Sequence, residues 1–463
     1  MKVDLSALPP SIRSGGSHRG ILRGWGMVAL FLLFYTIAFI DRQVITMMVK
    51  PLQEQLGLSE FQISLLMGPS FGLFFALCGL GVGGLVDRYS RRWLVTLATV
   101  LWGMATCLCG LAGSYAIMLV GRMGVGVGES ALTPAAHSLI IEQFPRERLS
   151  TAIASYSLGA VIGGGLATAI GGTVVHLIEK SDPVVIAGVA TFQPWQLVFL
   201  CVGLPTILMA FLALLVREEK RDARTREAGH ATSPASMRAF FTFCLERPAV
   251  FFGLPVSFGL LNIITNAYAA WTPTFMARSY GWDMAQIGVT WGAQHILAAT
   301  LGQIGGAMLV DRLYARGMRD AHVRYQWLGV IVAVPINIVA LLSSNPWIFL
   351  VLNAVYFILC YPFLGYAIAA LQLHTPVHLR GRMSAWFIAV ITVMGTFVGA
   401  PITAWLTQAV FVDKAMIGWS LITVSVVFAP LVVVMMMWVG SHLRRLDHDG
   451  ADARAAAAKA PVA

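Results

Sequence analysis

Four charged residues lie inside long apolar stretches of the sequence, where a charge is expensive. Asp41 and Arg42 stand near the end of the first stretch, and Arg122 and Glu129 stand within the fourth. Arg122 and Glu129 are two helical turns apart, so they project from one face of a helix. A lone charge in hydrocarbon costs from about 2.5 to more than 10 kcal/mol, so such groups pair and mark an ion or substrate path. We predict that the four residues form one charge network.

The chemistry that such a network supports is proton exchange. Hydration and neighbouring charge set the proton affinity of a carboxyl group, and both change when a cavity opens or closes. We expect Asp41 and Glu129 to exchange a proton, with Arg42 and Arg122 supplying the changing charge, and Arg122 chiefly neutralising Glu129. The alternative is a permanent ion-pair network with a structural role. No cofactor is expected, and a proton gradient is the expected driving force.

The elements that position these residues are membrane-spanning helices. Hydrophobic residues make up 57% of the 463 residues and charged residues 12%, against about 25% charged in soluble chains. Apolar stretches of about 20 residues, enough to cross a bilayer, recur along the chain. The predicted fold is an all-α membrane protein with twelve spans, at residues 24–48, 61–86, 93–113, 115–141, 150–177, 195–216, 248–277, 284–310, 327–343, 347–373, 382–408 and 417–440.

Basic residues indicate how the spans are oriented. Of the 32 Lys and Arg, 26 lie in the tails and alternate loops, 4 in the intervening loops and two within spans. By the positive-inside rule, both termini are predicted to be cytoplasmic. The net charge of +10 then reflects topology and attraction to anionic headgroups, and requires no nucleic-acid partner. Residues 1–23 are too polar for a cleavable signal peptide, so we expect a multi-pass protein of the plasma membrane, the inner membrane in a bacterium.

A weak internal repeat divides the chain. Leu85-Val86-Asp87-Arg88 returns as Leu309-Val310-Asp311-Arg312, and Arg146-Glu147-Arg148 is echoed by Arg380-Gly381-Arg382. The offsets, 224 and 234 residues, are nearly equal. Two related six-helix halves are therefore predicted. The expected domains are a tail at 1–23, a bundle at 24–216, a cytoplasmic linker at 217–247, a bundle at 248–440 and a tail at 441–463.

Several motifs resemble known transporters. The run Gly83-Gly84-Leu85-Val86-Asp87-Arg88-Tyr89-Ser90-Arg91-Arg92 is similar to the loop 2–3 signature of the major facilitator superfamily, with Ser90 in place of a glycine. The motifs that resemble the spinster family are Phe39-Ile40-Asp41-Arg42, Gly121-Arg122, Gly126, Gly128-Glu129-Ser130, Pro134 and Phe144-Pro145-Arg146-Glu147-Arg148. The spinster resemblance implies a carrier of lysolipids or sphingoid-type lipids that works by alternating access. It covers mainly the first five spans.

The repeated Asp-Arg pairs are candidates for a cytoplasmic gate. A carboxylate at a helix end can interact favourably with the positive N-terminus of a neighbouring helix. Arginines can bond carbonyls or carboxylates across the cytoplasmic face. Contacts made in only one gate position set the balance between states. The alternative is that the arginines only anchor the topology. The expected gate residues are Asp87, Arg88, Arg91, Arg92, Asp311 and Arg312.

The second half carries polar but uncharged residues in its predicted spans. Together with a charged wall in the first half, they describe an amphipathic cavity for a headgroup and an apolar body. Each is as readily an interhelical hydrogen-bond partner as a substrate ligand. The cavity candidates are Asn262, Asn266, Tyr268, Gln294, His295, Tyr356 and Tyr361.

Three function classes fit a chain of this kind. A secondary transporter explains the doubled architecture, the buried charges and the gate motifs together, whereas a channel or scramblase leaves the repeat unexplained. An enzyme or an ATP-driven pump is disfavoured, because His-Glu-x-x-His and Gly-x-x-x-x-Gly-Lys motifs are absent. The expected substrate is a small amphipathic, lipid-like molecule carried by a monomer. Small organic anions, which arginines hold bidentately, and drug-like compounds remain the alternative.

Overall fold

The protein is described here by a computed structural model that covers residues 18–144, 146–179, 184–186, 190–215, 242, 245–360, 363–375 and 380–459. It is helical except for one short antiparallel hairpin, in which Val184–Ile186 (β1) pairs with Ala190–Phe192 (β2). The prediction of an all-α membrane architecture is thereby confirmed, because ten helices are long and apolar enough to cross a membrane within the described part of the chain.

The helices of the first half follow the predicted spans closely, except that the second span is split between α4 and α5 and the fourth between α7 and α8. They are α2 (His18–Val44), η2 (Ile45–Met47), α3 (Val49–Leu56), α4 (Glu60–Met67), α5 (Pro69–Arg88), α6 (Arg91–Gly110), α7 (Tyr115–Glu129), α8 (Leu132–Gln143), α9 (Arg146–Glu179), α10 (Pro194–Ala210) and η3 (Phe211–Leu215). The fourth expected span is split between α7 and α8. Pro134 explains the break, since it lacks the N–H that would bond the carbonyl of Ser130.

The second half also consists of helices that are interrupted by short breaks. Its helices are η4 (Ala249–Gly253), α13 (Leu254–Tyr280), α14 (Met284–Ala315), α15 (Ala321–Leu342), α16 (Pro346–Cys360), α17 (Leu364–Leu373), α18 (Arg380–Met394), η6 (Gly395–Gly399), α19 (Ala400–Trp405), η7 (Leu406–Val410), η8 (Lys414–Met416) and α20 (Ile417–Lys459). The tenth expected span corresponds to α16 and α17. The count of twelve spans and the cytoplasmic termini stay predictions.

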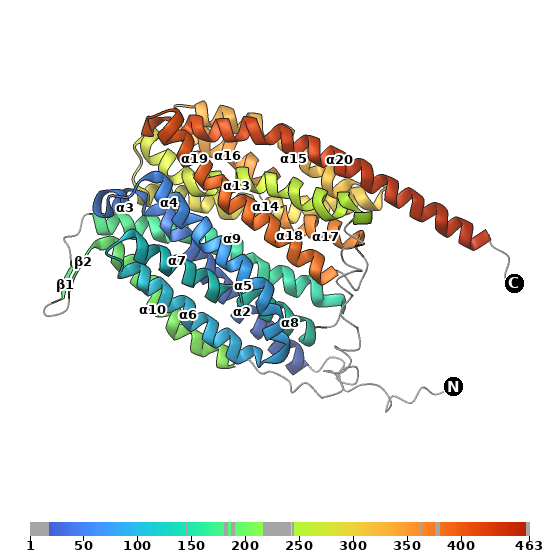
Figure 1. Cartoon of the computed structure of the whole chain (residues 1–463), viewed down its shortest axis with the longest axis horizontal. Helices are drawn as coiled ribbons and strands as arrows, with labels where there is room; N and C mark the ends of the chain where they lie inside the picture. Colours follow the sequence, from blue (N-terminus) through green and yellow to red (C-terminus); the bar gives the residue numbers. More distant parts are fainter. Residues whose placement is uncertain are drawn as a thin grey trace.

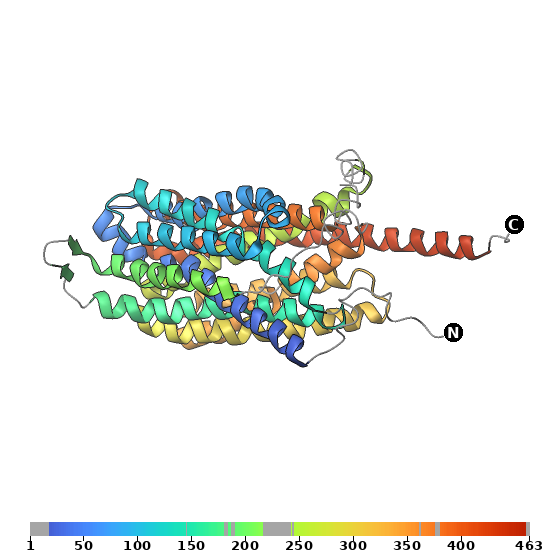
Figure 2. The same cartoon turned by 90° about the horizontal axis from the view of Figure 1, so that it is seen from below.

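The helices gather in two groups that follow the order of the chain. Helices α2 to α10 lie on one side of the molecule and α13 to α20 on the other (Figure 1), and the view turned by 90° shows both groups running along the same long axis (Figure 2). The linker predicted at 217–247 lies mostly outside the described residues. The domain limits themselves stay predictions.

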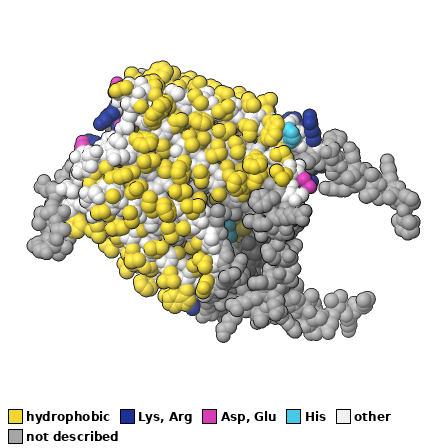
Figure 3. Space-filling model, in the orientation of Figure 1, with side chains coloured by type: hydrophobic (Ala, Val, Ile, Leu, Met, Phe, Trp, Pro, Cys, Tyr) yellow, Lys and Arg dark blue, Asp and Glu magenta, His cyan; other side chains and the backbone are white. Residues whose placement is uncertain are grey.

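Polar contacts join the two groups at one end, which we call the distal end. It carries α3, α4 and the β-hairpin and lies opposite the two chain termini (Figure 1). There Arg278 of α13 donates to the carboxylate of Glu60 of α4 at 2.6 Å, and the backbone N–H of Phe61 approaches the side-chain oxygen of Gln408 at 3.4 Å. The face of the molecule in Figure 3 is covered largely by hydrophobic side chains, with Lys and Arg at its edges.

Helices α9 and α14 pack backbone against backbone along the junction of the two groups. A Cβ atom added to Gly172 would lie 2.0 Å from the carbonyl oxygen of Met284, and one added to Gly288 would lie 2.4 Å from that of Thr168. Small residues allow such close approach of helices in membranes. The junction therefore depends on glycine at both positions.

Candidate functional site

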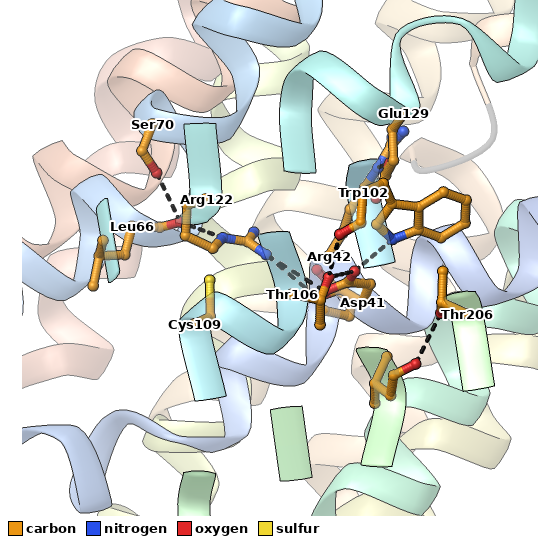
Figure 4. A network of polar contacts seen from close by, with 12 residues as sticks. Asp41, Arg42, Leu66, Ser70, Trp102, Thr106, Cys109, Arg122, Glu129 and Thr206 are labelled. Carbon is orange, nitrogen blue, oxygen red and sulfur yellow. Dashed lines mark hydrogen bonds and ion pairs between the residues drawn. The ribbon is translucent and has the colours of Figure 1, made fainter. Parts of the chain in front are cut away.

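Asp41 lies near the end of α2, fully buried, and is surrounded by donors from two other helices (Figure 4). Its Oδ2 atom accepts a hydrogen bond from Trp102 Nε1 at 2.6 Å and another from the hydroxyl of Thr106. Trp102 and Thr106 are one turn apart on α6, so both reach the same carboxylate. The Nη1 atom of Arg122 lies 3.9 Å from Oδ1. Asp41 therefore ties α2, α6 and α7 together.

Arg122 is also fully buried and is held from two directions (Figure 4). Its Nε donates to the carbonyl oxygen of Leu66 at 3.1 Å, and its Nη1 donates to the backbone oxygen of Asp41 at 3.4 Å. Leu66 lies in the last turn of α4, where a helix end leaves carbonyl oxygens open to outside donors. The guanidinium thus joins the break between α4 and α5 to the end of α2.

Glu129 pairs with Arg42 rather than with Arg122. The Oε2 atom of Glu129 accepts a hydrogen bond from Arg42 Nε at 2.5 Å, and the exposed fractions of the two side chains are 0% and 19%. The expectation that Arg122 chiefly neutralises Glu129 is therefore wrong. Seven residues along an α-helix correspond to about 10.5 Å, and Arg122 contacts Asp41 of the neighbouring helix instead.

The guanidinium of Arg42 lies among three phenylalanine rings. Its central carbon is 4.8 Å from the ring centre of Phe39, 4.6 Å from that of Phe71 and 4.8 Å from that of Phe75. We call these three rings the phenyl pocket. The predicted network of four charges is thus brought together, but as two pairs with different surroundings. Polar donors enclose Asp41, whereas aromatic rings surround Arg42, which pairs with Glu129.

The predicted gate residues are described only in part. The side chains of Asp87 and Arg88 lie outside the described residues. Arg91 is buried at the start of α6, whereas Asp311 and Arg312 are exposed near the end of α14. A gate role for these residues stays a prediction.

Asp320, which we did not single out in the sequence, forms an ion-pair cluster at the end that carries the termini. Its buried carboxylate accepts hydrogen bonds from Arg324, one turn further along α15, and from Arg444 of α20. Its oxygen lies 3.0 Å from Arg324 Nη2. The cluster fixes the start of α15 against α20.

The amide candidates of the second half are half-buried and make contacts between helices. Asn262 and Asn266 are half-buried on α13, and Asn262 donates to the carbonyl oxygen of Ile391 of α18 at 2.7 Å. Gln294 is half-buried on α14 and donates to Asn353 at 3.1 Å. A Cβ atom at Gly164 of α9 would lie 3.4 Å from Nε2 of the buried His295.

The tyrosine candidates lie elsewhere. Tyr268 and Tyr356 are fully buried, and the hydroxyl of Tyr268 is 2.9 Å from that of Ser425 within the second group. Their rings pack with centres 5.0 Å apart. The structure therefore places both inside the packing of the second group rather than on a cavity wall. Tyr361 lies outside the described residues.

Glu60 and Arg278 are the site residues that sequence reasoning missed. The sequence map placed both just outside a span, in loops, yet the Glu60 side chain is 0% exposed and that of Arg278 is 19% exposed. Arg278 also donates to the backbone oxygen of Lys414 at 3.1 Å. The sequence offered one signal for this pair, because two opposite charges stand at span ends on the same predicted side of the membrane. We call this pair the distal latch.

Comparisons with known proteins agree with this architecture. The family model of the Major Facilitator Superfamily matches residues 31–399. An MFS-type efflux pump of Mycolicibacterium smegmatis is 24% identical over 442 residues, which cover 93% of this chain and 95% of the pump. A galacturonate transporter of Dickeya chrysanthemi is 23% identical over 336 residues, or 69% of this chain and 92% of that protein.

The spinster resemblance is also found. Protein spinster of Drosophila melanogaster is 23% identical over 273 residues, which cover 59% of this chain and 42% of that protein. The crystal structure of a bacterial homologue of the human lysosomal transporter spinster, inward-facing and unoccupied, superposes with a TM-score of 0.75 at 22% identity. It covers 91% of this chain and 98% of that one. These relatives are transporters and not enzymes, and the family model spans most of the chain, so this integral membrane protein belongs to the major facilitator superfamily.

Proposed function

We propose that the protein is a proton-coupled secondary transporter that moves an amphipathic, lipid-like substrate by alternating access. The observation that carries the proposal is the ion pair between Arg42 and Glu129. Arg42 lies in the candidate span Gly24–Met47 and is partly exposed, and the carboxylate of Glu129 is fully buried. Burying two charges costs free energy, and charges inside a membrane protein usually mark a functional site.

The two carboxylates have different roles in this proposal. Asp41 is engaged by Trp102, Thr106 and Arg122, so losing its charge would disturb three partners at once. Glu129 is bonded through one oxygen only, and its Oε1 has no hydrogen-bond partner among the described residues. We assign proton exchange to Glu129 and the positioning of Arg122 to Asp41.

The polar contacts at the distal end support the alternating-access part of the proposal. The distal latch joins the two groups there through Arg278 and Glu60. With the predicted orientation, the distal end is extracellular. The structure then corresponds to a state that is closed on the extracellular side, and opening the distal end requires breaking the latch.

The chemistry of the side chains in the two groups favours an amphipathic substrate. The first group presents the phenyl pocket together with one ion pair, and the second presents the half-buried amides of Asn262 and Asn266. Aromatic faces suit an apolar body, while the amides and the ion pair suit a polar headgroup.

A small organic anion is the second candidate, because relatives at similar identity include galacturonate and hexuronate transporters. Arginine can hold a carboxylate through two hydrogen bonds, and Arg42 and Arg122 are both arginines. Here, however, both guanidiniums are already engaged by carboxylates of the chain. An organic anion would have to displace an internal carboxylate from one of them.

Counterflow in liposomes tests the transporter assignment, and a substrate panel tests the class. Unlabelled substrate on one side should accelerate the uptake of labelled substrate by a carrier, whereas a channel shows no such exchange. The panel contains lysophospholipids, sphingoid bases and sugar acids. We expect counterflow with an acyl-chain amphiphile. Counterflow with sugar acids alone would replace the lipid assignment by the organic-anion one.

A further inference from the structure

The charged end of Arg42 faces aromatic rings instead of oxygen atoms. Within the described residues, its hydrogen bond to a carboxylate runs through Nε, on the inner side of the guanidinium. Ring centres of Phe39, Phe71 and Phe75 lie 4.6 to 4.8 Å from its central carbon. The face of an aromatic ring carries partial negative charge, so three such rings around one point form a site for a cation.

The pocket is held open by close helix contacts that do not involve Arg42. A Cβ atom at Gly126 of α7 would lie 2.4 Å from the backbone oxygen of Phe71, and one at Gly163 of α9 would lie 2.7 Å from Cβ of Phe39. These contacts fix the ring-bearing turns of α5 and α2 against their neighbours. The pocket therefore persists when Arg42 moves.

Glu129 supplies a negative charge with unused acceptor capacity beside the rings. Its side chain is 0% exposed, and its Oε1 atom is buried without a hydrogen-bond partner among the described residues. A carboxylate bordered by aromatic rings is the chemistry that recognises methylated ammonium groups. An anion is disfavoured in the same place, because it would meet the negative faces of the rings.

We propose that the phenyl pocket and Glu129 form a binding site for the ammonium group of a zwitterionic substrate, and that Arg42 occupies this site as an internal ligand in its absence. The inference rests on the proposed function and names the headgroup that it would recognise. The Arg42 side chain is partly exposed and can therefore leave the site. It then pairs with the phosphate of the same headgroup, so the site gains no net charge.

Four short probes with the same hexyl chain test the headgroup. They are hexylphosphocholine, hexyltrimethylammonium, its uncharged tert-butyl analogue and hexyl phosphate, and binding to wild-type protein in nanodiscs is measured by calorimetry at pH 8. We expect the first two to bind about tenfold more tightly than the uncharged analogue. Equal affinity for the charged and uncharged probes, or binding of hexyl phosphate alone, would overturn the proposal.

Variants of the pocket give a second test, in which the sign of the effect is decisive. Arg42→Gln removes the internal competitor, so hexyltrimethylammonium should bind about tenfold more tightly than to wild type. Phe71→Leu keeps an apolar side chain but removes a ring face, and should weaken binding about tenfold. Phe74→Leu, on the same helix and outside the pocket, is the matched control and should leave affinity unchanged.

The two variants decide the question even if one fails to fold. A lower affinity of Arg42→Gln for hexyltrimethylammonium contradicts the internal-ligand role, and an unchanged affinity of Phe71→Leu contradicts the pocket. The outcome is separable from that of the proposed function. Proton-driven transport without any ammonium preference would refute the pocket alone, whereas the predicted binding pattern without proton-driven transport would refute the coupling alone.

Discussion

Breaking the distal latch should shift the protein toward a state that is open at the distal end. Glu60→Gln keeps the size of the side chain and removes its charge, so the contact with Arg278 at 2.6 Å is weakened. We expect this contact to form only while the two groups are closed at this end. Removing it therefore destabilises the closed state selectively.

The size of the shift follows from the burial of the pair. Glu60 is fully buried and Arg278 is partly exposed, and hydrogen bonds to charged groups contribute about 1.5–3 kcal/mol. Because 1.4 kcal/mol corresponds to tenfold, the ratio of closed to open protein should fall by about 10- to 100-fold. A protein that is closed at a ratio of about 99:1 would then reach about 10:1 to 1:1.

Distances between spin labels at the distal end measure this shift. Gly113→Cys on the first group and Ser344→Cys on the second are exposed label sites, used in a background without the native cysteines. We expect a second, longer distance to appear in Glu60→Gln and the wild-type distribution in Glu54→Gln, an exposed carboxylate of α3 that serves as the control. Exchanging the two charges, with Glu60→Arg and Arg278→Glu together, should restore part of the short distance. An unchanged distribution in Glu60→Gln would refute the reasoning.

Three further perturbations have defined outcomes. Asp41→Asn should lower the free energy of unfolding by about 3–5 kcal/mol, since it leaves Arg122 buried without its carboxylate, and a thermal melt that matches wild type would contradict this. Asp320→Asn should speed hydrogen–deuterium exchange around Arg444, because the ion pairs that hold α20 to α15 are lost; unchanged exchange there would leave the cluster without a structural role. Arg122→Lys should keep a steep rise of lipid affinity with acyl length, at about 0.8 kcal/mol per CH₂, and affinities independent of chain length in wild type and variant would favour the organic-anion alternative.

The charge network could be predicted from sequence because a charge in an apolar stretch stands out against its surroundings. The pairing within it could not. Whether Arg122 meets Asp41 or Glu129 depends on how α2, α4 and α7 pack, and the neutral donors Trp102 and Thr106 look like ordinary residues of a span.

Other parts of the site were hidden for related reasons. Glu60 and Arg278 stand at span ends, where each alone reads as a residue of the membrane surface, and only the meeting of the two groups buries them. A phenylalanine in an apolar helix carries no signal by itself, so the phenyl pocket emerges only when α2 and α5 are brought together around Arg42. Tyr268 and Tyr356 failed as cavity residues because the sequence does not show which face of a helix packs inside its own bundle.

Proton coupling through Glu129 is the central claim, and Glu129→Gln in proteoliposomes tests it most directly. At saturating substrate, this variant should exchange labelled for unlabelled substrate in counterflow, because exchange does not require net proton movement. It should not accumulate substrate when a pH gradient is imposed across the membrane, whereas wild type and the exposed control Glu54→Gln should. Accumulation by Glu129→Gln at the wild-type level under the same gradient would contradict the account.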